Sequence, residues 1–240
     1  IKGGMEKLIL SALEVLKIAA VVATTLFCGL YYYNSEKREM LAAMNTLTVP
    51  AGQRVNLKLP DGTSVWVNAR SKIIYPAIFS GSKREINLDG EAYFEVSKDP
   101  KHPFIVQTET IDVQVLGTHF NVDAYHDNLD VKTTLLSGSV AVSNKSKSVR
   151  MVLKPNEIAI YNKVEEKLTR KVLANAEDEI SWRQGEFIFD DLPLQEIARE
   201  LSNSFGTTIH IADTTLQNYR ITARFRNGED LETILSVLHN

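Results

Sequence analysis

The chain has 240 residues, and its 27 Lys and Arg residues against 30 Asp and Glu residues give a net charge of −3. This balance excludes a basic nucleic-acid-binding surface that covers the whole protein. Hydrophobic residues make up 44% of the chain and charged residues 24%, which predicts packed domains rather than a disordered or collagen-like chain.

An uncharged stretch near the N-terminus predicts a transmembrane helix over residues 18–35. At about 1.5 Å per residue, such a helix covers roughly 27 Å of a hydrocarbon core about 30 Å thick. Three consecutive tyrosines, residues 31–33, would form an aromatic belt, and the lysines before the stretch favour a cytoplasmic N-terminus. Residues 1–17 are then a cytoplasmic stub, and residues 36–49 are a juxtamembrane stalk. Because the first residue is Ile1, we expect the chain to be a fragment.

The single cysteine, Cys28, leaves one alternative for this stretch open. The stretch could instead be a cleaved lipoprotein signal in which Cys28 is acylated, because Cys28 lies at a plausible distance from the start of the chain. The bulky Phe27 directly before it fits such a signal poorly. One cysteine also excludes an internal disulfide framework and a cysteine-rich metal site.

Residues 50–172 predict an all-β domain. Val55, Leu57 and Leu59 alternate with polar residues, the Pro-Asp-Gly-Thr turn at 60–63 follows, and the alternation then resumes, which is typical of a β-hairpin. About ten short runs of this kind are separated by turn residues. A sandwich, a roll and a solenoid-like stack all fit, because no repeat of fixed length distinguishes them.

The pattern changes after an acidic linker at residues 173–184, and residues 185–240 predict a small α+β module. We expect the order β-α-β-β-α, with the middle strands at 208–211 and 220–225. The first helix has one apolar face that predicts the core of the module, made by Leu194, Ile197, Leu201 and Phe205. The chain ends at Asn240, inside or just after the second helix, so we expect the module to be incomplete.

The sequence predicts no enzyme active site, no metal site and no cofactor. It contains no phosphate-binding loop, no dinucleotide-binding glycine motif and no nucleophile elbow, and its 5 histidines lack the spacing of metal ligands. Glu91 and Glu95 share one face of a predicted strand, where a solvated sheet face is the usual explanation.

One peptide bond, Gly117-Thr118, has the composition of a self-cleavage site. A Thr hydroxyl can attack the preceding carbonyl where the backbone is strained, and a preceding Gly permits that conformation. A simple turn or bulge between two strands is the structural alternative.

Five sequence motifs occur in an order that is typical of a known family. They are LPDGT (59–63), GEAYFEV (90–96), PFIV (103–106), VLGTHFNV (115–122) and WRQGEFIFDDLPLQEI (182–197). In this order they resemble the FecR family of transmembrane anti-sigma factors, over about residues 18–240. The resemblance implies an inner-membrane protein with one transmembrane helix, a periplasmic all-β domain and a C-terminal module similar to the short N-terminal domain of secretins and TonB-dependent transducers.

The resemblance also implies a signalling function that regulates the uptake of iron or another nutrient. An outer-membrane TonB-dependent transducer would engage the periplasmic module, and a cytoplasmic domain would then change its hold on an extracytoplasmic-function sigma factor. Residues 1–17 are too few for that sigma-binding domain. Some members of the family are cleaved at the Gly-Thr of the VLGT motif, which implies single-turnover self-cleavage at Gly117-Thr118.

Strand addition at an exposed edge of the C-terminal sheet is the expected mode of partner binding. The candidate contact residues are Phe187, Phe189, Asp190, Arg220, Thr222 and Arg224. The alternative function is a membrane-anchored carbohydrate- or protein-binding β-module, with Trp66, Tyr75, Tyr93 and Tyr125 as a sugar platform. A periplasmic hydrolase has no supporting group of residues.

Overall fold

The computed structural model describes residues 17, 19–33, 43–226 and 228–239, and it separates into two units, Ile1–Ala43 and Met44–Asn240. In the first unit, residues 19–33 form a helix with exposed apolar side chains. Among the residues that the structure describes, no helix is both long enough and apolar enough to cross a membrane. The predicted span extends beyond them at residues 18, 34 and 35, and the predicted stub lies outside them apart from Lys17.

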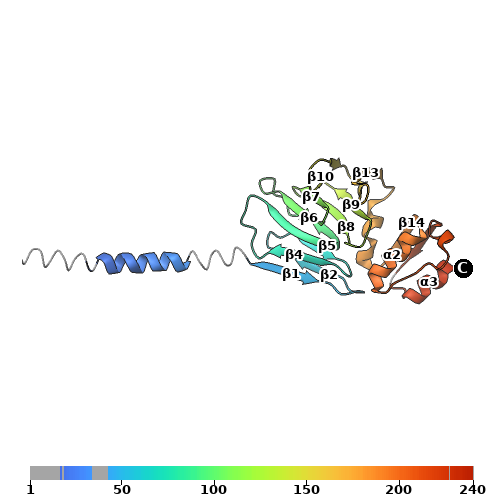
Figure 1. Ribbon diagram of the computed structural model, residues 1–240, viewed down its shortest axis with the longest axis horizontal. Helices are drawn as coiled ribbons and strands as arrows, with labels where there is room; N and C mark the ends of the chain where they lie inside the picture. The colour runs from blue at the N-terminus through green and yellow to red at the C-terminus, as the bar shows by residue number, and fades with distance from the viewer. Residues whose placement is uncertain (1–16, 18, 34–42, 227, 240) are drawn as a thin grey trace, which may run out of the picture. The chain divides into compact units, whose positions relative to one another are not determined.

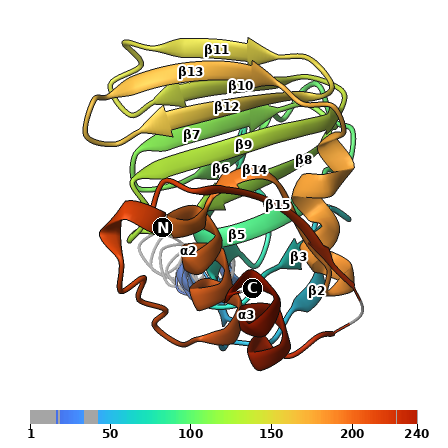
Figure 2. The same cartoon turned by 90° about the vertical axis from the view of Figure 1, so that its right-hand side faces the viewer.

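The second unit begins with thirteen strands, which confirms the predicted all-β domain (Figures 1 and 2). These strands, hereafter the β domain, are β1 (Met44–Thr48), β2 (Val55–Lys58), β3 (Ser64–Val67), β4 (Lys72–Pro76), β5 (Arg84–Glu95), β6 (Phe104–Gln107), β7 (Ile111–Val115), β8 (His119–Ala124), β9 (Asp130–Ser137), β10 (Val140–Asn144), β11 (Arg150–Leu153), β12 (Glu157–Asn162) and β13 (Lys167–Val172).

The strands form two sheets that share β5. The first sheet has the order β1-β4-β5-β6-β7-β10-β11, and the second sheet has the order β2-β3-β5-β8-β9-β12-β13. All pairs are antiparallel except β5 with β6. Figure 2 shows the strands stacked from β2 and β3 at one end to β11 and β13 at the other. Of the three predicted architectures, the structure is therefore the sandwich.

Strand β5 passes from one sheet to the other at Gly90. Its first half pairs with β4 and β6, and residues 90–95 pair with β3 and β8. Gly90 has a φ of +115°, and a Cβ added there would lie 2.3 Å from Oγ of Ser71. Only glycine fits this crossing, because it tolerates positive φ and has no side chain to clash. Residues Arg84–Glu95 are thus one continuous strand that contributes to both sheets.

The core of the sandwich fills the space between the sheets. Phe94 and Phe120 of the second sheet stack at 5.0 Å between ring centroids, and Phe104 of the first sheet lies 6.1 Å from Phe94. All three are fully buried. Side chains alternate between the two faces of a pleated strand, so each of these rings lies on the inner face of its own sheet and meets the others in the core.

The LPDGT motif forms the turn between β2 and β3 and is tied to β5 by an ion pair. The carboxylate of Asp61 accepts hydrogen bonds from the amide and the hydroxyl of Thr63. It also pairs with Nη1 of Arg84 at 2.6 Å, where both side chains are largely buried. The guanidinium of Arg84 lies over the ring of Phe104. The motif therefore encodes a buried electrostatic contact as well as a turn.

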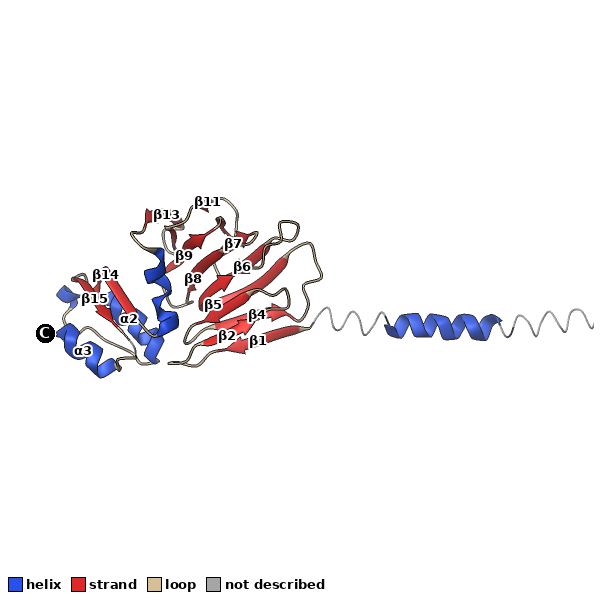
Figure 3. Ribbon diagram, turned by 180° about the vertical axis from the view of Figure 1, so that it is seen from behind, coloured by secondary structure: helices blue, strands red, loops and turns tan. Residues whose placement is uncertain are grey.

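The C-terminal module, residues 185–240, has fewer strands than predicted. It contains β14 (Phe187–Pro193), α2 (Leu194–Phe205), the short 3₁₀ helix η2 (Thr214–Leu216), β15 (Arg220–Phe225) and α3 (Leu231–His239). Strands β14 and β15 form a two-stranded antiparallel sheet beside the helices (Figure 3). The predicted strand at 208–211 is wrong, since this segment has no strand partner and Ile209 instead donates its amide to Oγ of Ser202. The observed order is β-α-β-α.

Two further segments differ from the sequence-based expectation. Strand β1 lies within the predicted stalk, where it pairs with β4. The predicted linker contains a 3₁₀ helix, η1 (Ala176–Gln184), whose Ile180 and Trp182 are buried against Tyr93. The linker is therefore packed on the β domain through apolar side chains that its acidic composition did not indicate.

Candidate functional site

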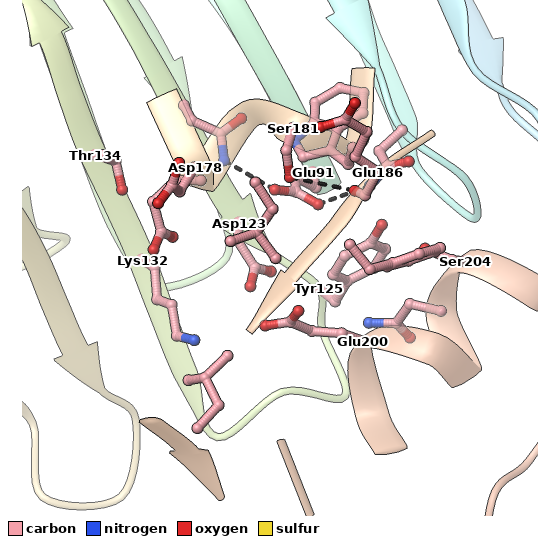
Figure 4. Close-up of a pocket in the computed structure, with 18 residues that line it drawn as sticks. Glu91, Asp123, Tyr125, Lys132, Thr134, Asp178, Ser181, Glu186, Glu200 and Ser204 are labelled. Atoms are coloured by element: carbon pink, nitrogen blue, oxygen red, sulfur yellow. Dashed lines mark hydrogen bonds between the residues drawn. The ribbon is translucent and has the colours of Figure 1, made fainter. Parts of the chain in front are cut away.

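A small cavity of about 90 Å³ lies between the outer face of the second sheet and the elements that follow it, η1, β14 and α2. Figure 4 shows Asp123, Lys132 and Glu200 pointing into this space from the sheet and from α2. Hereafter we call it the acidic cavity. Its charged lining residues are Glu91, Asp123, Lys132, Asp178, Glu179, Glu186 and Glu200.

Three polar contacts join the C-terminal module to the β domain around this cavity. Nζ of Lys132 lies 3.1 Å from Oε2 of Glu196 on α2. Nη1 of Arg70 donates to Oδ1 of Asn203 at 2.5 Å. At the end of α2, the amide of Gly52 donates to the carbonyl of Ser204 at 2.8 Å. The first of these involves largely buried side chains, which makes its ion pair less exposed to screening by salt.

Glu91 lies on the sheet face beneath the module. Its carboxylate accepts hydrogen bonds from the side-chain amides of Asn68 and Asn121, at 2.7 and 2.8 Å. These bonds favour ionisation, but burial and repulsion from Asp123 outweigh them and raise the pKa of Glu91 well above its usual value. The side-chain oxygen of Asn121, Oδ1, is buried and has no hydrogen-bond partner among the described residues.

The remaining acidic groups respond to the same surroundings. Burial, together with repulsion from Glu179 and Asp123, raises the pKa of Glu200 to about 7, although Lys132 opposes the shift. Burial likewise raises the pKa of Asp123 and of Glu179. For Lys132 burial opposes the charged form, but the neighbouring carboxylates prevail and raise its pKa, so the ammonium stays charged. The cavity therefore holds one permanent cation and several carboxylates that bind protons more tightly than usual.

These groups do not form a recognisable catalytic or metal-binding arrangement. Within the described part of the chain, no cluster of three or more His, Cys, Asp or Glu side chains could hold a metal ion. Glu91 is already engaged by two amides and Lys132 by Glu196. The arrangement is suited to controlling the contact between the module and the sheet.

Sequence reasoning missed this cavity. Glu91 and Glu95 do share one face of β5, as predicted, but only Glu95 is solvated: its side chain is 41% exposed, whereas Glu91 is covered by the module. The expectation of a solvated face was therefore wrong at Glu91. No spacing in the sequence could have shown this, because the cover comes from residues about 90 positions later in the chain.

The predicted cleavage site lies between β7 and β8. Gly117 has a φ of +144°, and a Cβ added there would lie 2.7 Å from Cα of Lys98. The hydroxyl of Thr118 is buried and donates to the carbonyl of Ser139 at 3.0 Å. The carbonyls of Leu116 and Thr118 accept amide hydrogen bonds from Asp99 and Val96. The loops that follow β5 and β9 thus hold the Gly117-Thr118 segment in place through hydrogen bonds.

The predicted partner-contact residues divide into two groups. Phe187 and Phe189 are buried in the core of the module with Ile197 and Leu201, so an exposed contact role is wrong for these two side chains. In contrast, the side chains of the other four candidates are exposed on β14 and β15: Asp190, Arg220, Thr222 and Arg224. Arg224 also lies 3.6 Å from Asp178 of η1.

The aromatic residues of the alternative function do not form an exposed sugar platform. Tyr125 is buried and donates its hydroxyl to the carbonyl of Ala69 at 2.7 Å. Tyr93 is buried under η1, with the guanidinium of Arg183 4.1 Å from its ring centroid. Trp66 and Tyr75 are half-buried and pack against two different apolar clusters. A carbohydrate-binding role therefore has no support from these side chains.

Comparison with known proteins gives matches to both folded parts. A family model described as FecR protein matches residues 45–141, and a model described as FecR, C-terminal matches residues 186–240. No curated protein matches the chain. Two crystal structures of a "putative anti-sigma factor" from Parabacteroides distasonis ATCC 8503 are similar to it at 30% sequence identity.

The similarity extends over most of each chain. One crystal structure, at 2.50 Å resolution, has a TM-score of 0.75, and the match covers 82% of this chain and 91% of the other. The second, at 1.65 Å resolution, has a TM-score of 0.76, with coverages of 81% and 90%.

Proposed function

This chain belongs to the FecR family, and on that premise we propose that it is an anti-sigma factor that relays a signal across the inner membrane. The observation that carries the proposal is the similarity to the anti-sigma factor structures from Parabacteroides distasonis, which includes most of both chains. The protein would act by binding other proteins and not as an enzyme with turnover.

In the proposed relay, a TonB-dependent outer-membrane transducer engages the C-terminal module in the periplasm. The module is proposed to be related to the short N-terminal domain of secretins and of such transducers. The signal then passes through a transmembrane helix at residues 18–35, supported by the absence of charged residues in that stretch. On the cytoplasmic side it alters the hold on an extracytoplasmic-function sigma factor. The regulated genes would serve the uptake of iron or another nutrient.

We place the transducer contact on the two-stranded sheet of the module. A two-stranded sheet leaves backbone groups available for a further strand, and added strands bind through those groups. Arg220 and Asp190 are exposed there, beside the irregular pairing between Phe189 and Leu192. Their opposite charges would favour a partner strand that also carries both signs.

Co-purification tests the relay directly. The tagged full-length protein would be isolated from cell envelopes with Arg220→Glu as a variant and Arg150→Glu, the same charge reversal at an exposed position on β11, as the matched control. We expect a TonB-dependent transducer and a sigma factor with the wild type and the control, and loss of the transducer alone with Arg220→Glu. Recovery of neither partner would overturn the relay.

Self-cleavage at Gly117-Thr118 is a second proposal for this chain, supported by the position of the buried Thr118 hydroxyl and by the positive φ of Gly117. Oγ of Thr118 would attack the carbonyl carbon of Gly117, the C–N bond would break, and the proton would pass to the released amine. Water would then hydrolyse the resulting ester to give two fragments.

A gel tests this step. We expect the wild type and Thr118→Ser to give two fragments and Thr118→Ala to give one intact chain, because only the hydroxyl is required. An intact wild-type chain would refute self-cleavage and would leave the relay untouched.

A further inference from the structure

The C-terminal module and the β domain have separate hydrophobic cores. The core of the β domain lies between its two sheets, and the core of the module lies between β14, α2, β15 and α3. The contacts described above between α2 and the β domain are hydrogen bonds and one ion pair. The module can therefore separate from the sheet without opening either core.

Separation would change the surroundings of the acidic cavity more than those of any apolar cluster. Glu91 and Asp123 lie on the sheet, whereas Glu200 belongs to α2, so docking brings these carboxylates together and leaves them only partly exposed to water. Lys132 is the only basic residue among the residues that line the cavity, and it already pairs with Glu196. Docking therefore brings carboxylates together around one lysine, and the charges of Lys132 and Arg199 oppose the resulting rise in the pKa of Glu200 without cancelling it.

We propose that docking of the C-terminal module on the second sheet takes up protons, so that this contact tightens in acid and loosens as the pH rises toward neutrality. The carboxylates that bind the protons are those of the acidic cavity, with Glu200 on the moving helix. The chain passes from η1 to β14 through Gly185, the left-handed C-cap of η1, with a φ of +83°. The contact is a pH-dependent latch, whatever partner the module binds.

The direction of the effect follows from the pKa of Glu200. An exposed Glu has a pKa near 4.5, and burial raises the pKa of Glu200 to about 7 in the docked state. The docked state thus holds the proton across this interval, and its advantage falls about tenfold per pH unit for each proton released. Between pH 4.5 and pH 7 the docking equilibrium would weaken roughly 80-fold through Glu200 alone. Lys132 stays charged throughout, so it does not reverse the trend.

One group acts in the opposite direction. Burial disfavours the charge of Glu196, but Lys132 prevails and lowers its pKa, so Glu196 stabilises docking only while it is ionised. That contribution is lost below the usual pKa of Glu, outside the interval in which Glu200 titrates. The charged and titratable groups that face the cluster from all neighbouring elements are Arg54, Arg70, Glu91, Asp123, Tyr125, Lys132, Lys171, Asp178, Glu179, Glu186, Glu196, Arg199, Glu200 and Arg224.

A distance measurement between the two parts tests the latch. The full chain, with Cys28→Ser, would carry spin labels at Val152→Cys on β11 and Tyr219→Cys beside β15, both exposed positions. Urea would be fixed at the concentration that separates half of the molecules at pH 6. Through Glu200 alone, we expect the ratio of docked to separated molecules to rise about sevenfold when the pH falls to 5, and to fall about fivefold at pH 7.

Two isosteric variants make the test specific. Glu200→Gln cannot take up the proton, so we expect its ratio to change less per pH unit than that of the wild type, by about five- to sevenfold. Glu232→Gln on α3 removes the same charge outside the cavity and should keep the wild-type slope. A wild-type ratio independent of pH would overturn the proposal, as would equal slopes for Glu200→Gln and the wild type. A reduced slope in Glu232→Gln would also overturn it, because net charge would then explain the effect.

Discussion

The crossing of β5 between the two sheets makes Gly90→Ala the most informative substitution in the β domain. The new Cβ would lie 2.3 Å from Oγ, 2.5 Å from Cβ and 2.6 Å from Cα of Ser71, all far inside contact distance. The last of these atoms is backbone, so rotation of a side chain cannot relieve the clash. The φ of +115° is also unfavourable for any residue other than glycine.

The expected loss can be estimated from these two terms. Backbone strain of this kind costs about 1–3 kcal/mol, and overpacking of a well-packed site costs about 1–3 kcal/mol more. The sum, about 2–6 kcal/mol, is a large part of the 5–15 kcal/mol that is typical of folded proteins. With a urea m-value of about 2 kcal/mol/M, the unfolding midpoint should fall by roughly 1–3 M.

Two other glycines separate the two terms. Gly228 has a φ of +81° but no atom within 4 Å of an added Cβ, so Gly228→Ala measures the strain alone. Gly81 has neither a positive φ nor a contact closer than 3.7 Å, so Gly81→Ala should change stability by less than about 1 kcal/mol. Urea unfolding followed by circular dichroism gives all three values. A loss for Gly90→Ala no larger than that for Gly228→Ala would refute the argument that Ser71 crowds the crossing.

Two further substitutions test the contacts that hold each part together. Arg84→Leu leaves the carboxylate of Asp61 buried without its cation, and we expect a loss of about 3–5 kcal/mol in the same urea assay; a change below about 1 kcal/mol would show that the ion pair does not stabilise the turn. Leu201→Ala removes a fully buried side chain from the module and should cost about 2–5 kcal/mol, seen as faster amide hydrogen exchange in α2 with little change in the β domain. Leu235→Ala, at an exposed position of α3, is its control and should have a small effect; equal effects of the two would contradict the assigned core.

Much of the fold could be predicted from local pattern, because a strand with one face in the core and one face in solvent has alternating apolar and polar residues. In β5, buried and exposed positions alternate from Arg84 to Gly90, which is the period expected for a strand with one face in a core. The apolar stripe of α2 likewise identified Ile197 and Leu201 as core residues, and both are fully buried. The turn at Asp61 was visible in its residue types.

A strand at the edge of a sheet can lack this alternation. In β13 almost every side chain is exposed, because it is the edge strand of the second sheet and its sequence, KLTRKV, contains little alternation to read. Residues 208–211 were predicted as a strand from their apolar residues, but no partner strand lies beside them in the described structure. Strand formation depends on a neighbour, which local sequence does not specify.

The apolar stretch at the N-terminus, the all-β domain, most of the apolar core of the module and the motifs that point to the family can all be predicted from local sequence. Which charged groups meet depends on the tertiary fold. Glu91, Asp123, Lys132 and Glu200 are far apart in the sequence, and each is unremarkable in its own strand or helix. Their proton affinities change because folding buries them together, and burial and mutual repulsion are properties of three-dimensional position that no local pattern encodes.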